Sequence, residues 1–277
     1  MKKLGLALGA GGSRGVAHIG FLQALEEAGI KPDYITGSSM GSVVGGAYAA
    51  GVPLEQMKKA VETLRLLDLI APAKEKGGIF GTKKMRALLV KYIGDKNFHE
   101  LKIPFHCVAV DMLKQEVMEF SEGNVIDAIV ASSCIPAVFH PQQREGMQLI
   151  DGGILERVPA MRVKEMGADV IVAVDVLGWR ETGEKVPGTI GVLLETIDIM
   201  DNYRTRHYKE EYEKEIDFWL EPELGNMSQF SLKEVKFAYQ KGYELGKKYA
   251  PLIKKKLIGW GLRGRIKRRK ERFNVTD

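Results

Sequence analysis

The chain has 277 residues, of which 45% are hydrophobic and 28% are charged, and this balance is typical of a globular protein with a sizeable core. No stretch approaches the roughly 18 consecutive apolar residues that span a bilayer as a helix, so we expect no integral membrane segment. The net charge is +5, but residues 247–277 hold twelve Lys or Arg against two Asp or Glu, which leaves 29 basic and 34 acidic residues in the first 246. The basic character therefore belongs to the C-terminal tail.

The two cysteines, Cys107 and Cys134, have neither metal-ligand spacing nor a Cys-x-x-Cys partner. They predict buried free thiols in a reducing compartment and no metal site. The apolar run at the N-terminus stops at Gly9, which favours a buried first strand over a signal peptide. We therefore expect a cytoplasmic protein.

Residues 4–8 predict a buried strand that runs into the glycine-rich loop Gly9–Gly15 and then into a helix over residues 16–29. The loop does not fit a dinucleotide site, because Arg14 occupies the place of the third glycine in Gly-x-Gly-x-x-Gly. It also lacks the Gly-Lys-Ser/Thr ending of a P-loop. A loop of this kind can instead hold an oxyanion with its backbone N–H groups.

A second strand over residues 33–38 leads into the pattern Gly37-x-Ser39-x-Gly41 and a helix to residue 51. A serine on a sharp strand-to-helix turn projects its hydroxyl clear of the sheet, and glycines on either side permit that turn. We therefore interpret Ser39 as a nucleophile. Because five-residue patterns also arise by chance, the rest of the chain has to supply the other parts of a site.

The remaining chain alternates strands with helices. Strands are predicted over 104–110, 116–120, 148–151, 170–176 and 218–220, and helices from Pro53 and over 83–93, 124–134, 189–212 and 231–249. Residues 71–82 are predicted as a loop that rims or covers the site. The alternation predicts an α/β fold with a mostly parallel central sheet covered by helices on both faces.

Three motifs stand in order along the chain: the glycine loop with Arg14, the Ser39 turn, and Asp151-Gly152-Gly153. Together they resemble the patatin-like phospholipases, and more closely the bacterial branch related to the neuropathy target esterase catalytic domain. The resemblance covers about residues 4–177 and includes the segment Ala131–Pro136. It implies a three-layer α/β/α fold, a Ser-Asp dyad with Ser39 as nucleophile and Asp151 as base, and no metal or organic cofactor.

The resemblance also assigns supporting roles by position. It implies that Gly11 and Gly12 supply oxyanion-hole N–H groups, and the general geometry of nucleophile turns adds the N–H of Met40. The residues expected to support the loop and the two turns are Arg14, Gly15, Gly37, Gly41, Gly152 and Gly153. The family pattern begins with three consecutive glycines, whereas this chain has Ala10 at the first, and we expect the cradle to survive this change.

Three other polar residues have plainer interpretations. His18 could complete a triad, but it lies one turn into the first helix and is better explained as a packed or hydrogen-bonded residue. Asp111 and Asp175 end strands at the edge where active sites of parallel sheets lie, yet loop bonding or helix capping is the simpler account. No histidine is therefore assigned to catalysis.

The sequence thus predicts an acyl hydrolase domain over residues 1–250 that cleaves fatty acyl esters of phospholipids or lysophospholipids through an acyl-enzyme. Two alternatives stay open: a general esterase or thioesterase on the same dyad, and a non-catalytic regulatory protein at the membrane. The basic tail, residues 251–277, mixes charge with Leu, Ile and Trp260 and suggests peripheral contact through Lys254 to Arg272 with the inner face of the membrane. A solvated tail or nonspecific nucleic-acid affinity is the alternative, and no specific nucleic acid is expected. The oligomeric state is left open.

Overall fold

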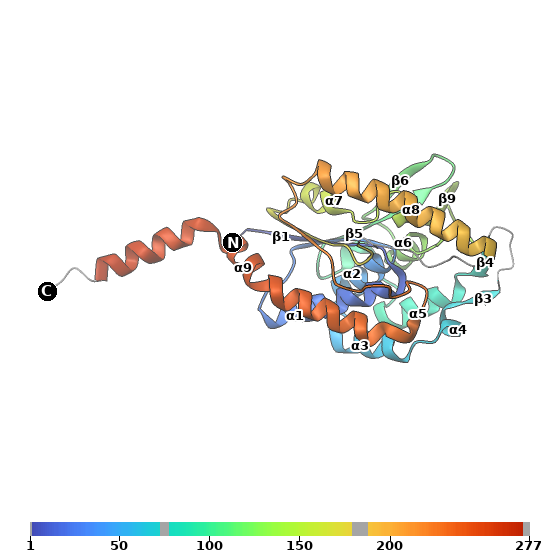
Figure 1. Ribbon diagram of the computed structural model, residues 1–277, viewed down its shortest axis with the longest axis horizontal. Coiled ribbons are helices and arrows are strands. Elements are labelled where there is room, and N and C mark those ends of the chain that lie inside the picture. The colour runs from blue at the N-terminus through green and yellow to red at the C-terminus, as the bar shows by residue number, and fades with distance from the viewer. Residues whose placement is uncertain (1, 73–77, 179–187, 274–277) are drawn as a thin grey trace.

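The structure is a computed structural model that describes residues 2–72, 78–178 and 188–273, with the side chains of 66, 190 and 260–273 outside that description (Figure 1). A central sheet lies between two helical layers (Figure 1). Its strands are β1 (Leu4–Leu8), β2 (Tyr34–Ser38), β5 (Phe105–Asp111), β6 (Glu116–Phe120), β8 (Gln142–Arg144), β9 (Met147–Asp151), β10 (Val170–Val174) and β11 (Phe218–Leu220). The α/β class expected from the sequence is confirmed.

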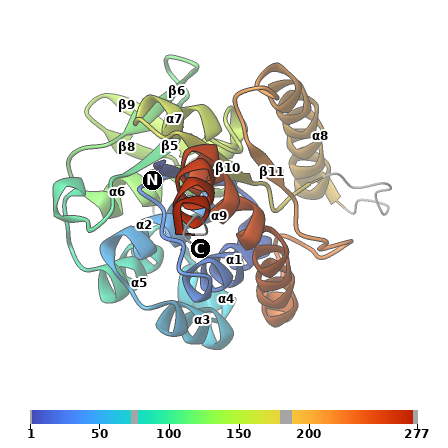
Figure 2. The ribbon, with the colours of Figure 1, turned by 90° about the vertical axis from the view of Figure 1, so that its left-hand side faces the viewer.

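Helices cover both faces of this sheet. One side carries α1 (Ala17–Glu27), α2 (Met40–Ala50), α3 (Leu54–Thr63), α4 (Leu66–Leu69), α5 (Lys83–Ile93) and α9 (Val235–Phe273), and the other carries α7 (Ala160–Glu165) and α8 (Gly188–Glu211) (Figure 1). Helix α6 (Val125–Ser132) packs on β5 and β9. Figure 2 shows α8 at one side of the molecule, beyond β11.

The core forms where the sequence is most continuously apolar. All five residues of β1 and of β10 are buried, as expected for central parallel strands covered on both faces. In α1 the helical spacing of Ile19, Leu22 and Leu25 buries one stripe against the sheet and α9. These elements fix the framework on which the site residues stand.

The sheet runs β11-β10-β1-β2-β5-β9-β8, with β6 also paired to β5. The five strands from β11 to β5 are parallel, whereas β6, β8 and β9 are antiparallel to their neighbours. Because β6 pairs with Cys107–Asp111 along one edge of β5, strands β2 and β9 must share the other edge. On that edge Ser38 pairs with Val108 and Asp151 pairs with Ala109, so the ends of β2 and β9 meet at two consecutive residues of β5.

The structure differs from the sequence-based expectation over residues 71–82. The segment predicted as a loop contains β3 (Ala71–Pro72) and β4 (Gly78–Gly81), and residues 73–77 lie outside the described part. Strand β4 also pairs with β7 (Ala137–Phe139), which gives a separate three-stranded sheet. Two- to four-residue strands that pair with a distant segment leave no local alternation to recognise.

The last helix extends beyond the predicted end near residue 249. Pro251 lies inside α9, and Ile253 and Leu257 on the following turns are buried in the main core. The backbone N–H of Lys2 donates to the carbonyl of Leu257 at 3.1 Å. The helical path is interrupted at Gly259, which has φ 64° and ψ 170°. Across the described residues, no helix is both long and apolar enough to cross a bilayer.

A buried ion cluster fastens α8 to the sheet. The Arg157 guanidinium contacts Asp175 at 3.0 Å, Asp201 at 3.1 Å and the side-chain oxygen of Asn202 at 2.7 Å. Asp175 also accepts from the backbone N–H groups of Leu177 and Gly178. Asp175 therefore acts as a loop-bonding residue, as the sequence suggested. The buried guanidinium pairs with both carboxylates, while its Nε has no partner among the described residues.

Candidate active site

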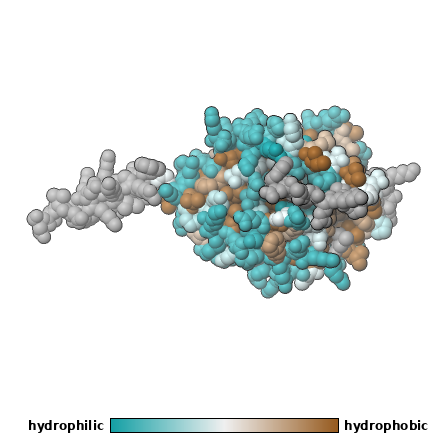
Figure 3. Space-filling view, viewed as in Figure 1, coloured by the Kyte–Doolittle hydropathy of each residue, from teal (hydrophilic) through white to brown (hydrophobic). Residues whose placement is uncertain are grey.

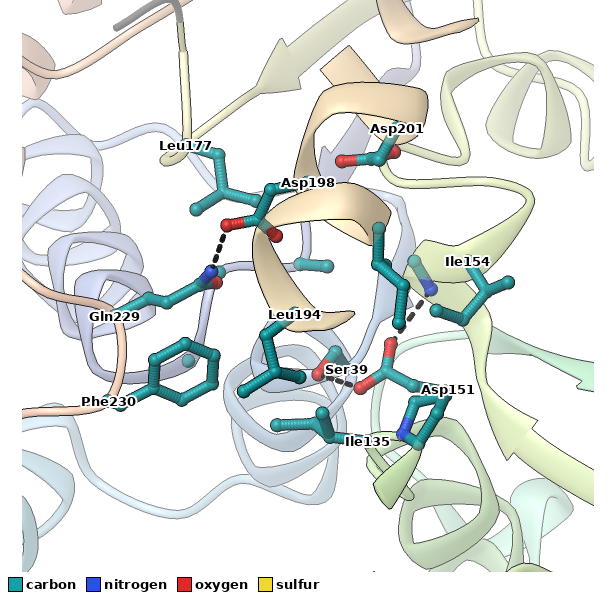
Figure 4. A pocket seen from close by; sticks show the side chains of 16 residues that line it. Ser39, Ile135, Asp151, Ile154, Leu177, Leu194, Asp198, Asp201, Gln229 and Phe230 are labelled. Carbon is teal, nitrogen blue, oxygen red and sulfur yellow. Dashed lines mark hydrogen bonds between the residues drawn. The ribbon is translucent and has the colours of Figure 1, made fainter. Parts of the chain in front are cut away.

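A half-open pocket lies at the carboxyl edge of the parallel strands (Figure 4). The strand ends, the glycine loop, α8 and the segment before α9 all contribute to it. Its lining residues are Ala10, Gly11, Gly12, Ser39, Ile135, Pro136, Asp151, Gly153, Ile154, Leu177, Leu194, Ile197, Asp198, Asp201, Gln229 and Phe230. Three sequence motifs that are far apart in the chain thus meet in one pocket.

Ser39 occupies a strained turn between β2 and α2. Its φ of 51° and ψ of −123° are unusual for a residue with a side chain, and such backbone conformations cost about 1–3 kcal/mol. The turn also brings Gly41 so close to the carbonyl of Leu8 that a Cβ there would collide with it. This turn places the Ser39 hydroxyl at the pocket, where Figure 4 shows it facing Asp151.

The two side chains predicted to react are in direct contact. The Ser39 hydroxyl donates to Oδ2 of Asp151 at 2.5 Å, and Oδ1 of Asp151 accepts from the backbone N–H of Gly153 at 2.8 Å. Both residues are buried. The second bond fixes the carboxylate plane, which leaves Oδ2 for the serine proton.

Burial sets the proton affinity of this carboxylate. Desolvation raises the pKa of Asp151 from 3.8 to about 7, and it outweighs the hydrogen bonds from Ser39 and Gly153, which lower that pKa. The nearby charge of Asp201 adds a smaller upward contribution. A carboxylate with a pKa near neutrality is a far better base for an alcohol than an exposed aspartate.

One short segment at the end of α6 holds the backbone of both residues. The N–H of Ser39 donates to Oγ of Ser132 at 2.9 Å, and the N–H of Asp151 donates to the carbonyl of Cys134 at 2.9 Å. Ser132 and Cys134 are themselves fully buried. These two hydrogen bonds from the end of α6 therefore help to set the spacing between Ser39 and Asp151.

The glycine loop also lines the pocket. Gly11 and Gly12 face the cavity, and we find no protein acceptor for their N–H groups in the described part of the chain. Gly12 has φ 52°, and its Cα lies against the carbonyl of Gln229, where a Cβ has no room. N–H groups left open at a helical start can bind an anion.

The buried side chain of Arg14 links the glycine loop to two neighbouring segments. Its guanidinium donates to the carbonyls of Val176 (2.8 Å), Leu177, Gly225 and Met227 (3.1 Å each). These four contacts join the glycine loop to the end of β10 and to the segment before α9. Arg14 thus ties the glycine loop to these two segments.

The other predicted residues lie around these groups. Met40 begins α2 directly after Ser39 and packs its side chain beside Gly15, but it is not among the residues that line the pocket. Gly37 is the penultimate residue of β2, and Gly152 begins a short 3-10 helix, Gly152–Ile154. Ala10 stands where the family pattern has its first glycine. Its methyl group lies beside Gly153, and a Cβ at position 153 would be only 2.9 Å from it.

His18 takes no part in this arrangement. Its Nε2 bonds to the carbonyl of Gly9 at 2.8 Å, and its Nδ1 has no partner within the described residues. Complete burial lowers the pKa of His18 to about 4, so the ring is neutral near pH 7. Asp111 likewise accepts from the N–H groups of Leu113 and Gln148, which is the loop-bonding role expected for it.

Sequence reasoning missed the residues that close the pocket. Leu194, Ile197 and Asp198 come from α8, and Gln229 and Phe230 come from the segment before α9. A hydrogen bond of 2.7 Å from Gln229 to Asp198 joins these two segments across the pocket (Figure 4). No local pattern marks them, because only the tertiary fold brings these segments to the strand ends.

The described residues contain no group of three or more His, Cys, Asp or Glu side chains placed to hold a metal ion.

The sequence was compared with models of protein families. Residues 6–164 match the family model described as patatin-like phospholipase. The chain belongs to the patatin-like phospholipase family. The matched residues include the glycine loop, Ser39, the end of α6 and Asp151.

Relatives of this patatin-like protein come from bacteria and fungi. A protein of Mycobacterium bovis described as an uncharacterized NTE family protein is 39% identical over 178 residues, which are 64% of this chain and 49% of that one, and Mycobacterium tuberculosis has the same match. A lysophospholipase of Emericella nidulans is 33% identical over 184 residues, 63% of this chain and 12% of the fungal protein. The chain thus spans about half the length of its mycobacterial relatives.

The same fold occurs in a solved structure. VipD from Legionella pneumophila superposes with a TM-score of 0.51 at 14% sequence identity, over 90% of this chain and 66% of that one. At this identity the match supports the patatin-like α/β fold alone.

The contact between Ser132 and Ser39 predicts a specific loss. Ser132→Ala leaves the buried N–H of Ser39 without an acceptor, which costs about 1–3 kcal/mol of unfolding free energy. It also loosens the Ser39 turn, so labelling by a serine-directed fluorophosphonate slows. Urea unfolding and labelling rates measure the two effects.

Ser133→Ala is the matched control. Its hydroxyl is buried one residue away and has no hydrogen-bond partner among the described residues. We expect this variant to unfold and label like the wild type. Equal behaviour of the two alanine variants would show that Ser132 does not position the nucleophile.

Proposed function

We propose that the protein is a serine acyl hydrolase that cleaves fatty acyl esters of phospholipids or lysophospholipids. The observation that carries this proposal is the 2.5 Å hydrogen bond from the Ser39 hydroxyl to a buried Asp151 carboxylate. Family membership supports the reaction class, and one relative is described as a lysophospholipase. Since that relative is far longer than this chain, the substrate class is part of the proposal.

The reaction starts at Ser39. As its oxygen attacks the ester carbonyl carbon, the hydroxyl proton moves to Oδ2 of Asp151. The tetrahedral intermediate collapses, the C–O bond to the alcohol breaks, and Asp151 returns the proton to the leaving oxygen. The acyl group stays on Ser39 until a water molecule, deprotonated by Asp151, attacks its carbonyl carbon. The bond to the Ser39 oxygen then breaks, Asp151 returns the proton to that oxygen, and the fatty acid leaves.

The developing negative charge is stabilised by backbone groups. In this proposal the N–H groups of Gly11 and Gly12 donate to the oxyanion, with Met40 as a third donor at the start of α2. Arg14 keeps the loop in place through its four carbonyl contacts. Donors held rigidly in advance require no reorganisation when the charge appears.

The pocket lining favours an acyl chain over a polar substrate. Ile135, Ile154, Leu177, Leu194 and Phe230 present apolar side chains around the reacting pair (Figure 4). Burial of methylene groups against such residues contributes roughly 0.8 kcal/mol each. A general esterase or thioesterase on the same dyad is the second candidate, because the dyad chemistry alone does not select the alcohol or thiol that leaves.

Removal of either reacting group tests the proposed dyad. Ser39→Ala abolishes labelling by a fluorophosphonate and hydrolysis, and Asp151→Asn lowers the hydrolysis rate about 10³- to 10⁴-fold because the base is lost. Fatty acid release from phospholipids, lysophospholipids, simple esters and thioesters provides the readout. Ser133→Ala serves as the active control.

An unlabelled wild-type protein would contradict the proposal. Turnover of simple esters or thioesters with none of the lipids would instead favour the second candidate.

We further propose that the basic tail contributes peripheral membrane contact through Lys254 to Arg272. Among its first lysines, Lys254 donates to the carbonyl of Ala28 and Lys256 contacts Asp217 at 2.7 Å. The side chains from residue 260 onward lie outside the described part. The bond from Lys2 to Leu257 places the start of this tail at the amino ends of the strands, whereas Ser39 follows a carboxyl end. The C-terminal part of α9 accordingly lies toward the viewer in Figure 2.

A truncation tests the tail. Because Leu257 packs in the core, the variant should end at Ile258. We expect it to bind vesicles that contain phosphatidylglycerol more weakly than the full chain, since each basic residue near an anionic leaflet contributes about 1 kcal/mol. Sedimentation with the vesicles measures this, and equal binding by both proteins would refute the role of the tail.

A further inference from the structure

Helix α8 has apolar side chains on two opposite faces. Its inner face lines the pocket with Leu194 and Ile197 and is held by the contact between Asp201 and Arg157. Its outer face exposes large apolar side chains, which Figure 3 shows as brown atoms over α8. A helix that covers a domain normally presents polar residues outward. The outer face of α8 therefore suits a second apolar environment.

The exposed residues follow the helical repeat. At 100° per residue they fall within one arc of about 120° of the helix surface, and they are 46–68% exposed: Val192, Leu193, Ile199, Met200 and Tyr203. We call these five residues the α8 stripe. It runs over eleven residue steps, or about 16 Å of helix. Five of the large exposed hydrophobic side chains thus gather on one helix.

The size of the α8 stripe disfavours a protein partner. Five side chains of this kind expose on the order of 500 Å², which is at the upper end of the apolar patches on monomers. A standard protein interface buries about 800 Å² on each partner, so a second copy would need contacts beyond the stripe. A lipid surface has no such minimum, because it receives a single amphipathic helix lying in its plane.

The stripe lies on a helix that also forms part of the pocket wall. Leu194 and Ile197 line the pocket from the same turns of α8 that carry the stripe on their other side. Phe230, a further lining residue, is also exposed. Whatever binds the stripe therefore contacts a helix that forms one wall of the pocket.

We propose that the α8 stripe docks on the surface of a phospholipid bilayer and so holds a helix that forms one wall of the pocket at the lipid. This inference rests on the proposed function, since it deepens how a lipid substrate reaches Ser39. It is separate from the tail, because the tail starts at the other end of the strands. The stripe positions the pocket, whereas the tail can only tether the protein.

The test uses the full chain with the double substitution Ile199→Glu and Met200→Glu. Both side chains are 62% exposed, so the change leaves the core intact. Vesicles of pure phosphatidylcholine report the stripe, because they carry no net charge for the tail to bind. We expect vesicle affinity and turnover of vesicle phospholipid to fall at least about tenfold. Hydrolysis of a monomeric short-chain ester should stay unchanged.

Leu113→Glu is the matched control, an equally exposed leucine in the turn between β5 and β6. It should bind and turn over vesicles like the wild type. Unchanged vesicle binding by the double variant would overturn the inference while leaving the hydrolase proposal intact. A wild type that is dimeric by light scattering, together with a monomeric double variant, would overturn it in favour of a second copy of the chain.

If the wild type hydrolyses no ester at all, the hydrolase proposal fails. Loss of vesicle binding in the double variant would still support the stripe, because binding is measured without turnover.

Discussion

The proposed pair Ser39 and Asp151 depends on where two strands end along one edge of β5. Strand β2 leaves that edge at Val108, and β9 reaches it at Ala109 from the opposite direction. Ser39 and Asp151, more than a hundred residues apart in sequence, are thereby brought to adjacent positions although β2 and β9 do not pair with each other in the described sheet. The end of α6 then fixes both backbones through Ser132 and Cys134.

The burial that makes Asp151 a stronger base also makes the stability of the fold depend on pH. Because burial raises the pKa of Asp151 to about 7, the folded state holds its proton more tightly than the unfolded chain, and the resulting stability is lost as pH rises from about 4 toward 7. The ionised form that the proposed mechanism needs is therefore the less stable one. Arg157 and Arg14 pair with other buried groups around the pocket, namely carboxylates and backbone carbonyls.

The sequence predicts the parts of the site that are local and misses those that are tertiary. The Ser39 turn, the glycine loop and Asp151-Gly152-Gly153 each carry a recognisable backbone requirement, and the buried run at Val170–Val174 marks a central strand. The lining from α8 and the segment at Gln229 follows only from packing across the sheet, as does the pairing of β4 with β7. The exposed α8 stripe is likewise visible only once its inner face is known.

In the proposed mechanism Asp151, without a histidine, takes the proton of Ser39. This step can be followed by the rate of fluorophosphonate labelling of Ser39, mapped by mass spectrometry, as pH is varied about two units on either side of 7. We expect the rate to rise through a single ionisation near pH 7 as Asp151 loses its proton, and to stay low and flat in Asp151→Asn. A profile that Asp151→Asn leaves unchanged would contradict it.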